Sequence, residues 1–335
     1  MISAIVSGGL KAVIWSLAVI GFAALVLTGL IAWPVRQLPE LASISDARKS
    51  VDFSALPAIE RFQARDGTVL GFRHYPAVGP ATGRAAIVIH GSSGSSGATI
   101  HVLSGALAAH GVETFAVDIR GHGASGTRGD IGYVGQLEDD LADFVTVVRK
   151  STPTAPLTLI GHSAGGAFAL RVAGSPIQNL FARTVLLAPY LGYSAPTNRP
   201  NSGGWASADI PRILGLLALR AVGITCCEAL PVLAFAVPPN SEKNLVPAYS
   251  DRLMRNFATH QDFRTDLAAV TKPVTIFSGT EDELMLANKY VEAVRGTTPP
   301  VNVKLIEGVN HMGIVSNPAA ISIIAADVAT AGLNS

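Results

Sequence analysis

Short apolar runs alternate with segments of helical spacing from about residue 59 to the C-terminus. The continuous apolar run at 85–89 predicts a strand that is buried on both faces. The runs at 112–117, 157–160, 183–188, 273–278 and 301–306 are also predicted to be strands. Apolar positions at helical spacing follow most of them, at 99–110, 135–148, 167–173, 284–295 and 319–331. This alternation predicts an α/β fold with a mostly parallel sheet and right-handed crossovers.

Two segments depart from the alternation. Residues 59–75 hold two strand-like runs on either side of Asp66-Gly67, which predicts a β-hairpin. Residues 190–269 do not continue the strand–helix repeat, and an insert of this length predicts a cap over the edge of the sheet. Within it, the proline-broken apolar stretch 214–237 is expected to be partly helical and to form the roof of an apolar pocket.

The N-terminal segment is strongly apolar. Residues 12–33 include no charged side chain. As a helix, this segment is long enough to cross a hydrocarbon core of ~30 Å. Trp15 and Trp33 lie near its ends, as interfacial anchors do. A cleaved signal peptide would have a shorter apolar core and a small-residue cleavage site, and no good site precedes Trp33-Pro34. We therefore expect a single-pass membrane protein, although the flanking charges do not decide its orientation.

The expected organisation of the chain follows from these patterns. It comprises a membrane anchor at 1–35 with a transmembrane helix at about 12–33, a linker at 36–57, and a folded α/β domain at 58–335 with the cap insertion at about 190–269.

Composition limits the classes of function. The net charge is +1, so there is no electrostatic case for binding nucleic acid. Cys226 and Cys227 are adjacent, and neighbouring cysteines rarely form a disulfide. No group of His, Cys, Asp or Glu has metal-ligand spacing. We therefore expect neither a metal nor a cofactor.

The sequence Gly161-His-Ser163-Ala-Gly165 joins a predicted strand to a predicted helix. A Gly-x-Ser-x-Gly turn at such a junction strains the serine backbone and presents the hydroxyl above the edge of the sheet. The glycine- and serine-rich segment 90–97 follows another buried strand, where its backbone N–H groups can turn toward a ligand. These two loops predict a nucleophile and an oxyanion hole.

Three predicted strands are followed by reactive residues: Ser163, Asp282 and His311. The carboxyl ends of parallel strands meet at one edge of a sheet, so these side chains are expected to converge there. Their order along the chain, Ser then Asp then His, is the order of a hydrolase triad on this kind of sheet.

From about residue 59 onward, the chain resembles the α/β-hydrolases, and more narrowly the monoacylglycerol lipase, lysophospholipase and proline-iminopeptidase-like serine hydrolases. The resemblance implies an α/β-hydrolase fold, with helices on both faces of the sheet, and a Ser–His–Asp triad; it is much less specific for substrate. The motifs that carry it are His90-Gly91, Asp118-x-Arg-Gly-His-Gly-x-Ser125, Gly-His-Ser163-Ala-Gly-Gly, Gly279-Thr-x-Asp282 and Asn310-His311-Met-Gly.

The triad residues receive distinct roles. Ser163 is the expected nucleophile, and His311 is the base that accepts its proton and later protonates the leaving group. Asp282 is expected to fix the tautomer of the imidazole and stabilise the imidazolium. The oxyanion would be bound by the backbone N–H of Ala164 and that of Ser92.

Alternatives to these assignments remain open in the sequence. Ser93 could replace Ser92 as the oxyanion donor, Glu281 or Glu283 could replace Asp282, and His260 could replace His311. His162 is expected to pack beneath the serine turn. The charged loop 118–125 is expected to shape the end of its strand through hydrogen bonds.

An apolar cap favours esters with a fatty acyl or other apolar acyl group, such as lysophospholipids or monoacylglycerols. A membrane anchor agrees with lipid substrates. An aminopeptidase is the alternative enzyme, and it would need a carboxylate to bind the α-ammonium group of its substrate. The candidates for that carboxylate are scattered: Asp209, Glu228, Glu242 and Asp251. A third possibility is a binding scaffold with an idle triad.

Overall fold

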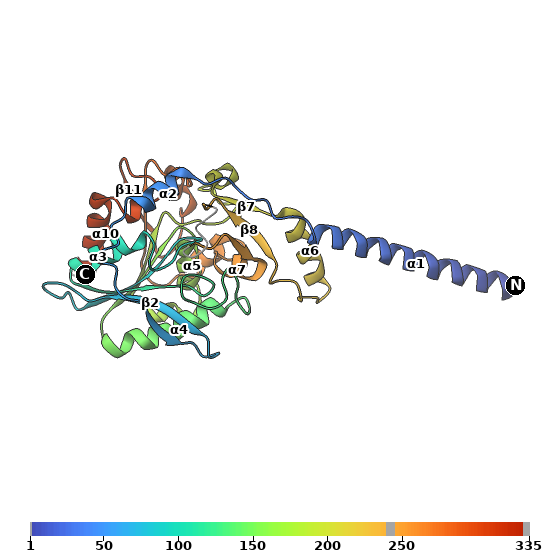
Figure 1. Ribbon diagram of the computed structural model, residues 1–335, viewed down its shortest axis with the longest axis horizontal. Helices are drawn as coiled ribbons and strands as arrows, with labels where there is room; N and C mark the ends of the chain where they lie inside the picture. The colour runs from blue at the N-terminus through green and yellow to red at the C-terminus, as the bar shows by residue number, and fades with distance from the viewer. Residues whose placement is uncertain (1, 239–244, 331–335) are drawn as a thin grey trace.

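An eight-stranded sheet forms the centre of the folded domain (Figure 1). The computed structural model describes residues 2–238 and 245–330, with side chains from residue 10 onward. The strand order is β1-β2-β4-β3-β5-β6-β10-β11. The strands are β1 (Glu60–Gln63), β2 (Val69–Tyr75), β3 (Arg84–Ile89), β4 (Val112–Val117), β5 (Leu157–His162), β6 (Arg183–Leu187), β10 (Val274–Gly279) and β11 (Asn302–Ile306).

The pairing of the strands confirms the predicted sheet. Strands β1 and β2 form the expected antiparallel hairpin, and β2 is also antiparallel to β4. All other neighbours are parallel. The carboxyl ends of β5, β10 and β11 therefore lie at the same edge of the sheet, where parallel α/β folds place their sites.

Helices cover both faces of the sheet. Helices α4 (Gln136–Ser151) and α5 (Ala164–Ala173) contribute to one cluster of buried apolar side chains. Helices α3 (Ile100–Ala109) and α10 (Pro318–Thr330) contribute to a second cluster. Because β3 alternates between the two clusters, with Ile87 in one and Val88 in the other, its continuous apolar run is explained by burial on both faces. The domain also includes the 3₁₀ turns η1 (Pro176–Leu180) and η4 (Gly313–Val315).

The predicted helix at 284–295 is wrong over its first half. Only the short turn η3 (Ala287–Lys289) and helix α9 (Tyr290–Ala293) form there. The N–H groups of Leu284 and Met285 donate to the carboxylate of Asp282, and Met285 forms an isolated bridge with Asn198. The Leu286 N–H donates to the carbonyl of Thr197 at 2.8 Å, so residues 285–286 pair with residues 197–198 and the helix begins only after them.

Residues 190–269 contain a small antiparallel sheet that the sequence did not indicate. Its strand order is β7 (Ala206–Ala208), β8 (Pro231–Phe235) and β9 (Ala248–Ser250). The 3₁₀ turn η2 (Pro200–Gly204) precedes it, and the helices of the segment are α6 (Ile210–Ala221), α7 (Asp251–Asn256) and α8 (Phe263–Ala269).

The expectation that the whole stretch 214–237 forms a pocket roof is wrong for α6. Leu214 and Leu217 are both 53% exposed. In contrast, Val232 and Phe235 of β8 are buried. Strand β8 therefore provides the inner layer of this segment, whereas α6 presents apolar side chains to the outside.

Helix α1 (Ile2–Ile31) extends away from the domain (Figure 1). Its segment Leu10–Ile31 is long and apolar enough to cross a membrane, has a mean hydropathy of 2.3, and is not buried against the rest of the described chain. The last turn of α1 contacts α6. There the Arg212 guanidinium donates to the carbonyls of Ile31, at 2.8 Å, and Trp33.

The segment 36–57, predicted as a linker, includes a helix that packs on the domain. Helix α2 (Ala42–Lys49) follows Leu41, whose N–H donates to the carbonyl of Ala236 at 3.1 Å. Leu38, Leu41 and Ile44 pack against the larger buried cluster. The chain thus returns from the end of α1 across the domain before entering β1 (Figure 1).

Candidate active site

Ser163 occupies a sharp turn between β5 and α5. Its backbone has φ 55° and ψ −118°, a conformation that L-residues rarely adopt. Its N–H donates to the carbonyl of Leu187 at 2.9 Å. A Cβ at Gly161 would lie 2.1 Å from the carbonyl oxygen of Gly165, and one at Gly165 would lie 2.3 Å from that of His90. The two glycines are therefore required by the close approach of the backbone at this turn.

Asp282 and His311 form a buried hydrogen-bonded pair. The His311 Nδ1 donates to Asp282 Oδ2 at 2.9 Å, and both side chains are almost fully buried. Asp282 Oδ1 accepts from the N–H groups of Leu284 and Met285 at 2.9 and 2.7 Å. Burial by itself would raise the pKa of Asp282, but His311 and these backbone donors outweigh it, and the pKa is lowered. Asp282 is thus held as a carboxylate that fixes Nε2 of His311 as the free nitrogen.

The alternative acids and bases have other partners. Glu283 Oε2 accepts from the backbone N–H of His311 at 2.9 Å, so it holds the loop and not the imidazole. Glu281 is exposed. His260 pairs with Asp266 of α8. Among these candidates only Asp282 contacts the ring of His311.

His162 is buried, as expected for a residue that packs beneath the serine turn, and it supports the loop that carries His311. Its Nε2 donates to the carbonyl of His311 at 3.2 Å, and the two rings are 4.9 Å apart. Burial, with the neighbouring His311, lowers the pKa of His162 to about 3. The His162 imidazole is therefore neutral at pH 7 and acts as a hydrogen-bond donor.

The backbone N–H groups of Ser92 and Ala164, which lie near Ser163, donate to no acceptor in the described chain. The neighbouring N–H of Ser93 is already occupied, because it donates to the hydroxyl of Tyr249 at 2.7 Å. The Ser92 hydroxyl accepts from the indole N–H of Trp205 at 2.8 Å, which links the loop 90–97, called the oxyanion loop below, to the residue before β7. Of the two donors that the sequence left open, the structure favours Ser92 over Ser93.

The polar loop 118–125 is structural, as expected. Asp118 accepts from the N–H of Ser96 at 2.6 Å and from that of Ala124 at 2.8 Å. The Arg120 guanidinium pairs with Asp140 at 2.7 Å and with Asp66 at 2.9 Å. These contacts tie the oxyanion loop, the hairpin and α4 together behind the site.

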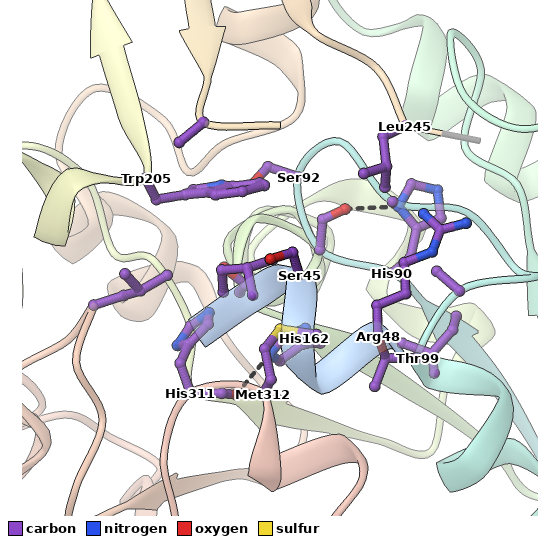
Figure 2. Close-up of a pocket in the computed structure, with 18 of the residues that line it drawn as sticks. Ser45, Arg48, His90, Ser92, Thr99, His162, Trp205, Leu245, His311 and Met312 are labelled. Carbon is purple, nitrogen blue, oxygen red and sulfur yellow. Dashed lines mark hydrogen bonds between the residues drawn. The ribbon is translucent and has the colours of Figure 1, made fainter. Parts of the chain in front are cut away.

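Ser163 and His311 line one cavity of about 180 Å³ (Figure 2). No hydrogen bond joins the two side chains in this structure; such catalytic contacts are often long before substrate binds and shorten afterwards. Most of the wall is apolar and comes from several parts of the chain: Ile44, Ala98, Ile100, Trp205, Ala236, Pro238, Leu245, Leu284 and Met312.

Sequence reasoning missed three elements of this site. Arg48 of α2 lines the cavity, and Trp205 and Tyr249 bind the oxyanion loop. Nothing in the local sequence around these residues indicates those contacts. Among residues 10–238 and 245–330, no group of three or more His, Cys, Asp or Glu side chains is placed to hold a metal ion.

A strained serine turn and a buried Asp–His pair at the carboxyl edge of a parallel sheet define an α/β-hydrolase. Residues 81–315 match the family model described as serine aminopeptidase, S33, within the Hydrolase_4 group. The chain belongs to this family and, as an enzyme, to the carboxylic ester hydrolases.

Characterised relatives are similar over most of the domain. A monoacylglycerol lipase of Mycolicibacterium smegmatis is 25% identical over 234 residues, which cover 67% of this chain and 80% of the relative. The human monoglyceride lipase is 29% identical over 153 residues, 45% of this chain and 48% of the relative.

The fold is shared with solved structures. A soluble variant of monoglyceride lipase from Saccharomyces cerevisiae, in complex with a substrate analogue, superposes with a TM-score of 0.62 at 16% identity, covering 83% of this chain and 97% of that one. The monoacylglycerol lipase of Paleococcus ferrophilus gives a TM-score of 0.56 at 15% identity, covering 78% and 98%. These similarities establish the α/β-hydrolase fold.

Proposed function

We propose that this chain is a membrane-anchored serine hydrolase that cleaves carboxylic esters of lipid or acyl type, such as lysophospholipids or monoacylglycerols. The observation that carries the proposal is the Asp282–His311 hydrogen bond, with His311 and Ser163 on the wall of one apolar cavity. An imidazole oriented in this way can take a proton at Nε2, and Ser163 is the hydroxyl presented to that cavity.

The reaction would proceed through an acyl-enzyme. The Ser163 oxygen attacks the ester carbonyl carbon while its proton passes to His311 Nε2. The N–H groups of Ala164 and Ser92, which are free in the described chain, would bind the oxyanion. His311 then gives the proton to the departing alcohol. In the second half of the cycle, His311 activates a water molecule that releases the fatty acid.

The cavity favours an ester over a peptide with a free amino terminus. No carboxylate side chain lies among its described lining residues, whereas an aminopeptidase needs one to bind an α-ammonium group. The earlier candidates are engaged elsewhere. Asp209 accepts from the N–H of Arg212, and Glu228 and Asp251 pair with Arg220, while Glu242 lies outside the described residues. The names of the relatives, several of them monoacylglycerol lipases, also support a lipid ester.

Helix α1 would anchor the domain at a membrane as a single pass. Support comes from the length and hydropathy of Leu10–Ile31 and from α6, which contacts the last turn of α1. Ile210, Leu214 and Leu217 of α6 are all more than half exposed, and this spacing forms one apolar stripe. We propose the division into an anchor at 1–35, a connection at 36–57 and a hydrolase domain at 58–335 with its cap at about 190–269. A cleaved signal sequence is the alternative, and N-terminal sequencing of the mature protein separates the two.

A fluorophosphonate probe tests the chemistry. We expect the full-length protein in neutral detergent to be labelled, and the Ser163→Ala variant not to be labelled. Turnover of p-nitrophenyl esters of rising chain length should then exceed that of proline and alanine arylamides. Faster cleavage of the arylamides would favour the aminopeptidase. An unlabelled wild type, under conditions where a known esterase reacts, would favour a binding scaffold. The full chain is required because α2 forms part of the cavity.

A further inference from the structure

Arg48 places a positive charge in the wall of the cavity that holds Ser163. It lies in the last turn of α2. Figure 2 shows its side chain extending from this helix toward the part of the cavity where His90 and Leu245 are drawn. The cation therefore faces the space that the substrate would occupy.

The Arg48 guanidinium has no hydrogen-bond or ion-pair partner in the described chain. It is partly buried, and burial lowers its pKa, with no carboxylate acting in the opposite direction. Five N–H donors in a partly desolvated place are unfavourable until an acceptor meets them. The neighbouring Lys49 differs, because its ammonium pairs with Asp46 at 2.9 Å and its side chain is 71% exposed.

The rest of the described wall provides no carboxylate to balance this charge. The described lining residues include two cations, Arg48 and Lys49, and no Asp or Glu. Most of the others are apolar or glycine, so their side chains cannot accept hydrogen bonds from a guanidinium. An anion brought by the substrate would supply the missing acceptor, and a planar guanidinium suits the two oxygens of a carboxylate or phosphate.

Helix α2 is held in place and not loosely attached. The N–H of Leu41 bonds to Ala236, which itself lines the cavity. Ile44, one turn before Arg48, packs against the buried cluster and also lines the cavity. Arg48 is thus presented from a fixed element, as a binding residue must be to discriminate between substrates.

We propose that Arg48 is a specificity-determining residue that binds an anionic group, a phosphate or carboxylate, on the ester substrate. This assignment rests on the proposed ester hydrolysis and deepens it. The enzyme would then prefer an anionic acyl ester, such as a lysolipid with a phosphate near its ester, over a neutral monoacylglycerol of the same chain.

Three oleoyl esters test the assignment with full-length protein in neutral detergent micelles. They are 1-oleoylglycerol, which is neutral, 1-oleoyl lysophosphatidate, which carries a phosphate, and oleoyloxyacetate, which carries a carboxylate. We expect the Arg48→Gln variant to lose about 10- to 100-fold in kcat/KM for the anionic ester or esters that use this site. Its kcat/KM for oleoylglycerol should stay within about twofold, which also shows that the variant is folded. The control Arg61→Gln removes an exposed arginine of β1 that does not line the cavity, so it should leave all three values unchanged.

The outcomes are distinguishable. Loss with the phosphate ester alone, or with the carboxylate ester alone, identifies the source of the anion. An equal change with all three esters, or no change with either anionic ester, overturns the role of Arg48 while leaving ester hydrolysis intact. If the wild type hydrolyses none of the three, the proposed function itself fails and this assignment fails with it.

Discussion

Replacing Tyr249 with Phe should both destabilise the protein and slow catalysis. The Tyr249 hydroxyl accepts from the N–H of Ser93 at 2.7 Å and donates to Nε2 of His122 at 2.6 Å. All three residues are almost completely buried. Burial lowers the pKa of His122 well below its ordinary value, so its imidazole is neutral. Its Nδ1 donates to the carbonyl of Arg120 at 3.3 Å, which leaves Nε2 as the acceptor. The hydroxyl therefore joins the cap strand β9 to the oxyanion loop through two satisfied bonds.

The expected loss of stability follows from the two groups that the substitution leaves without a hydrogen-bond partner, the Ser93 N–H and the His122 imidazole. A buried polar group that loses its partner costs about 1–3 kcal/mol, so losing both bonds should lower the free energy of unfolding by about 2–6 kcal/mol. The lower end applies if a water molecule occupies the place of the hydroxyl. Because Ser93 adjoins Ser92, the N–H of Ser92, which is the proposed oxyanion donor, should also be displaced. The loss in kcat should be smaller than the ~10²–10³-fold cost of losing such a donor outright.

Urea unfolding and ester turnover measure the two effects. Trp205 reports on the cap, because its ring lies 5.6 Å from Phe235, which in turn contacts Tyr249. Tyr193→Phe is the matched control, since Tyr193 is 85% exposed and its hydroxyl has no hydrogen bond in the described chain. A Tyr249→Phe variant with a free energy of unfolding within about 0.5 kcal/mol of wild type and an unchanged kcat would refute this reasoning.

Two further predictions address the triad and its support. Asp282→Asn should lower kcat by about 10⁴-fold, because the amide cannot hold the productive imidazole tautomer. The control Glu281→Gln changes an exposed neighbour and should have little effect. Steady-state kinetics of the two variants decide which residue is the acid. His162 has a folded-state pKa of about 3, so the unfolded chain binds more protons and this group makes stability fall as pH drops from about 6.5 toward 3. Between pH 7.5 and 5, His162 lowers the free energy of unfolding by about 2 kcal/mol. In urea titrations, the His162→Asn variant should therefore lose about 2 kcal/mol less than wild type over this interval. Equal losses would contradict the burial of a neutral His162.

The sheet and the serine turn could be read from the sequence because their determinants are local. Consecutive aliphatic residues indicate strands buried on both faces, and Gly161 and Gly165 around Ser163 indicate a turn that excludes side chains. The convergence of Ser163, Asp282 and His311 was then expected from the rule that parallel strands end at one edge. The helix at 284–295 failed for a reason that is not local. Met285 forms a bridge with Asn198, and the Leu286 N–H donates to the carbonyl of Thr197, so a distant part of the chain holds these residues out of the helix.

The sequence by itself determined the fold class, the loops that carry the candidate triad and the apolar N-terminal helix, since each depends on residues close together in the chain. Only the tertiary structure decided what surrounds Ser163. Trp205 lies 113 residues from Ser92, and Tyr249 lies 156 residues from Ser93, yet both bind the oxyanion loop. Arg48 reaches the cavity because Leu38, Leu41 and Ile44 pack against the domain. Apolar packing brings such residues together without any short-range pattern in the sequence. No local motif therefore predicts the choice between Ser92 and Ser93 as the proposed oxyanion donor, or the charge of the cavity.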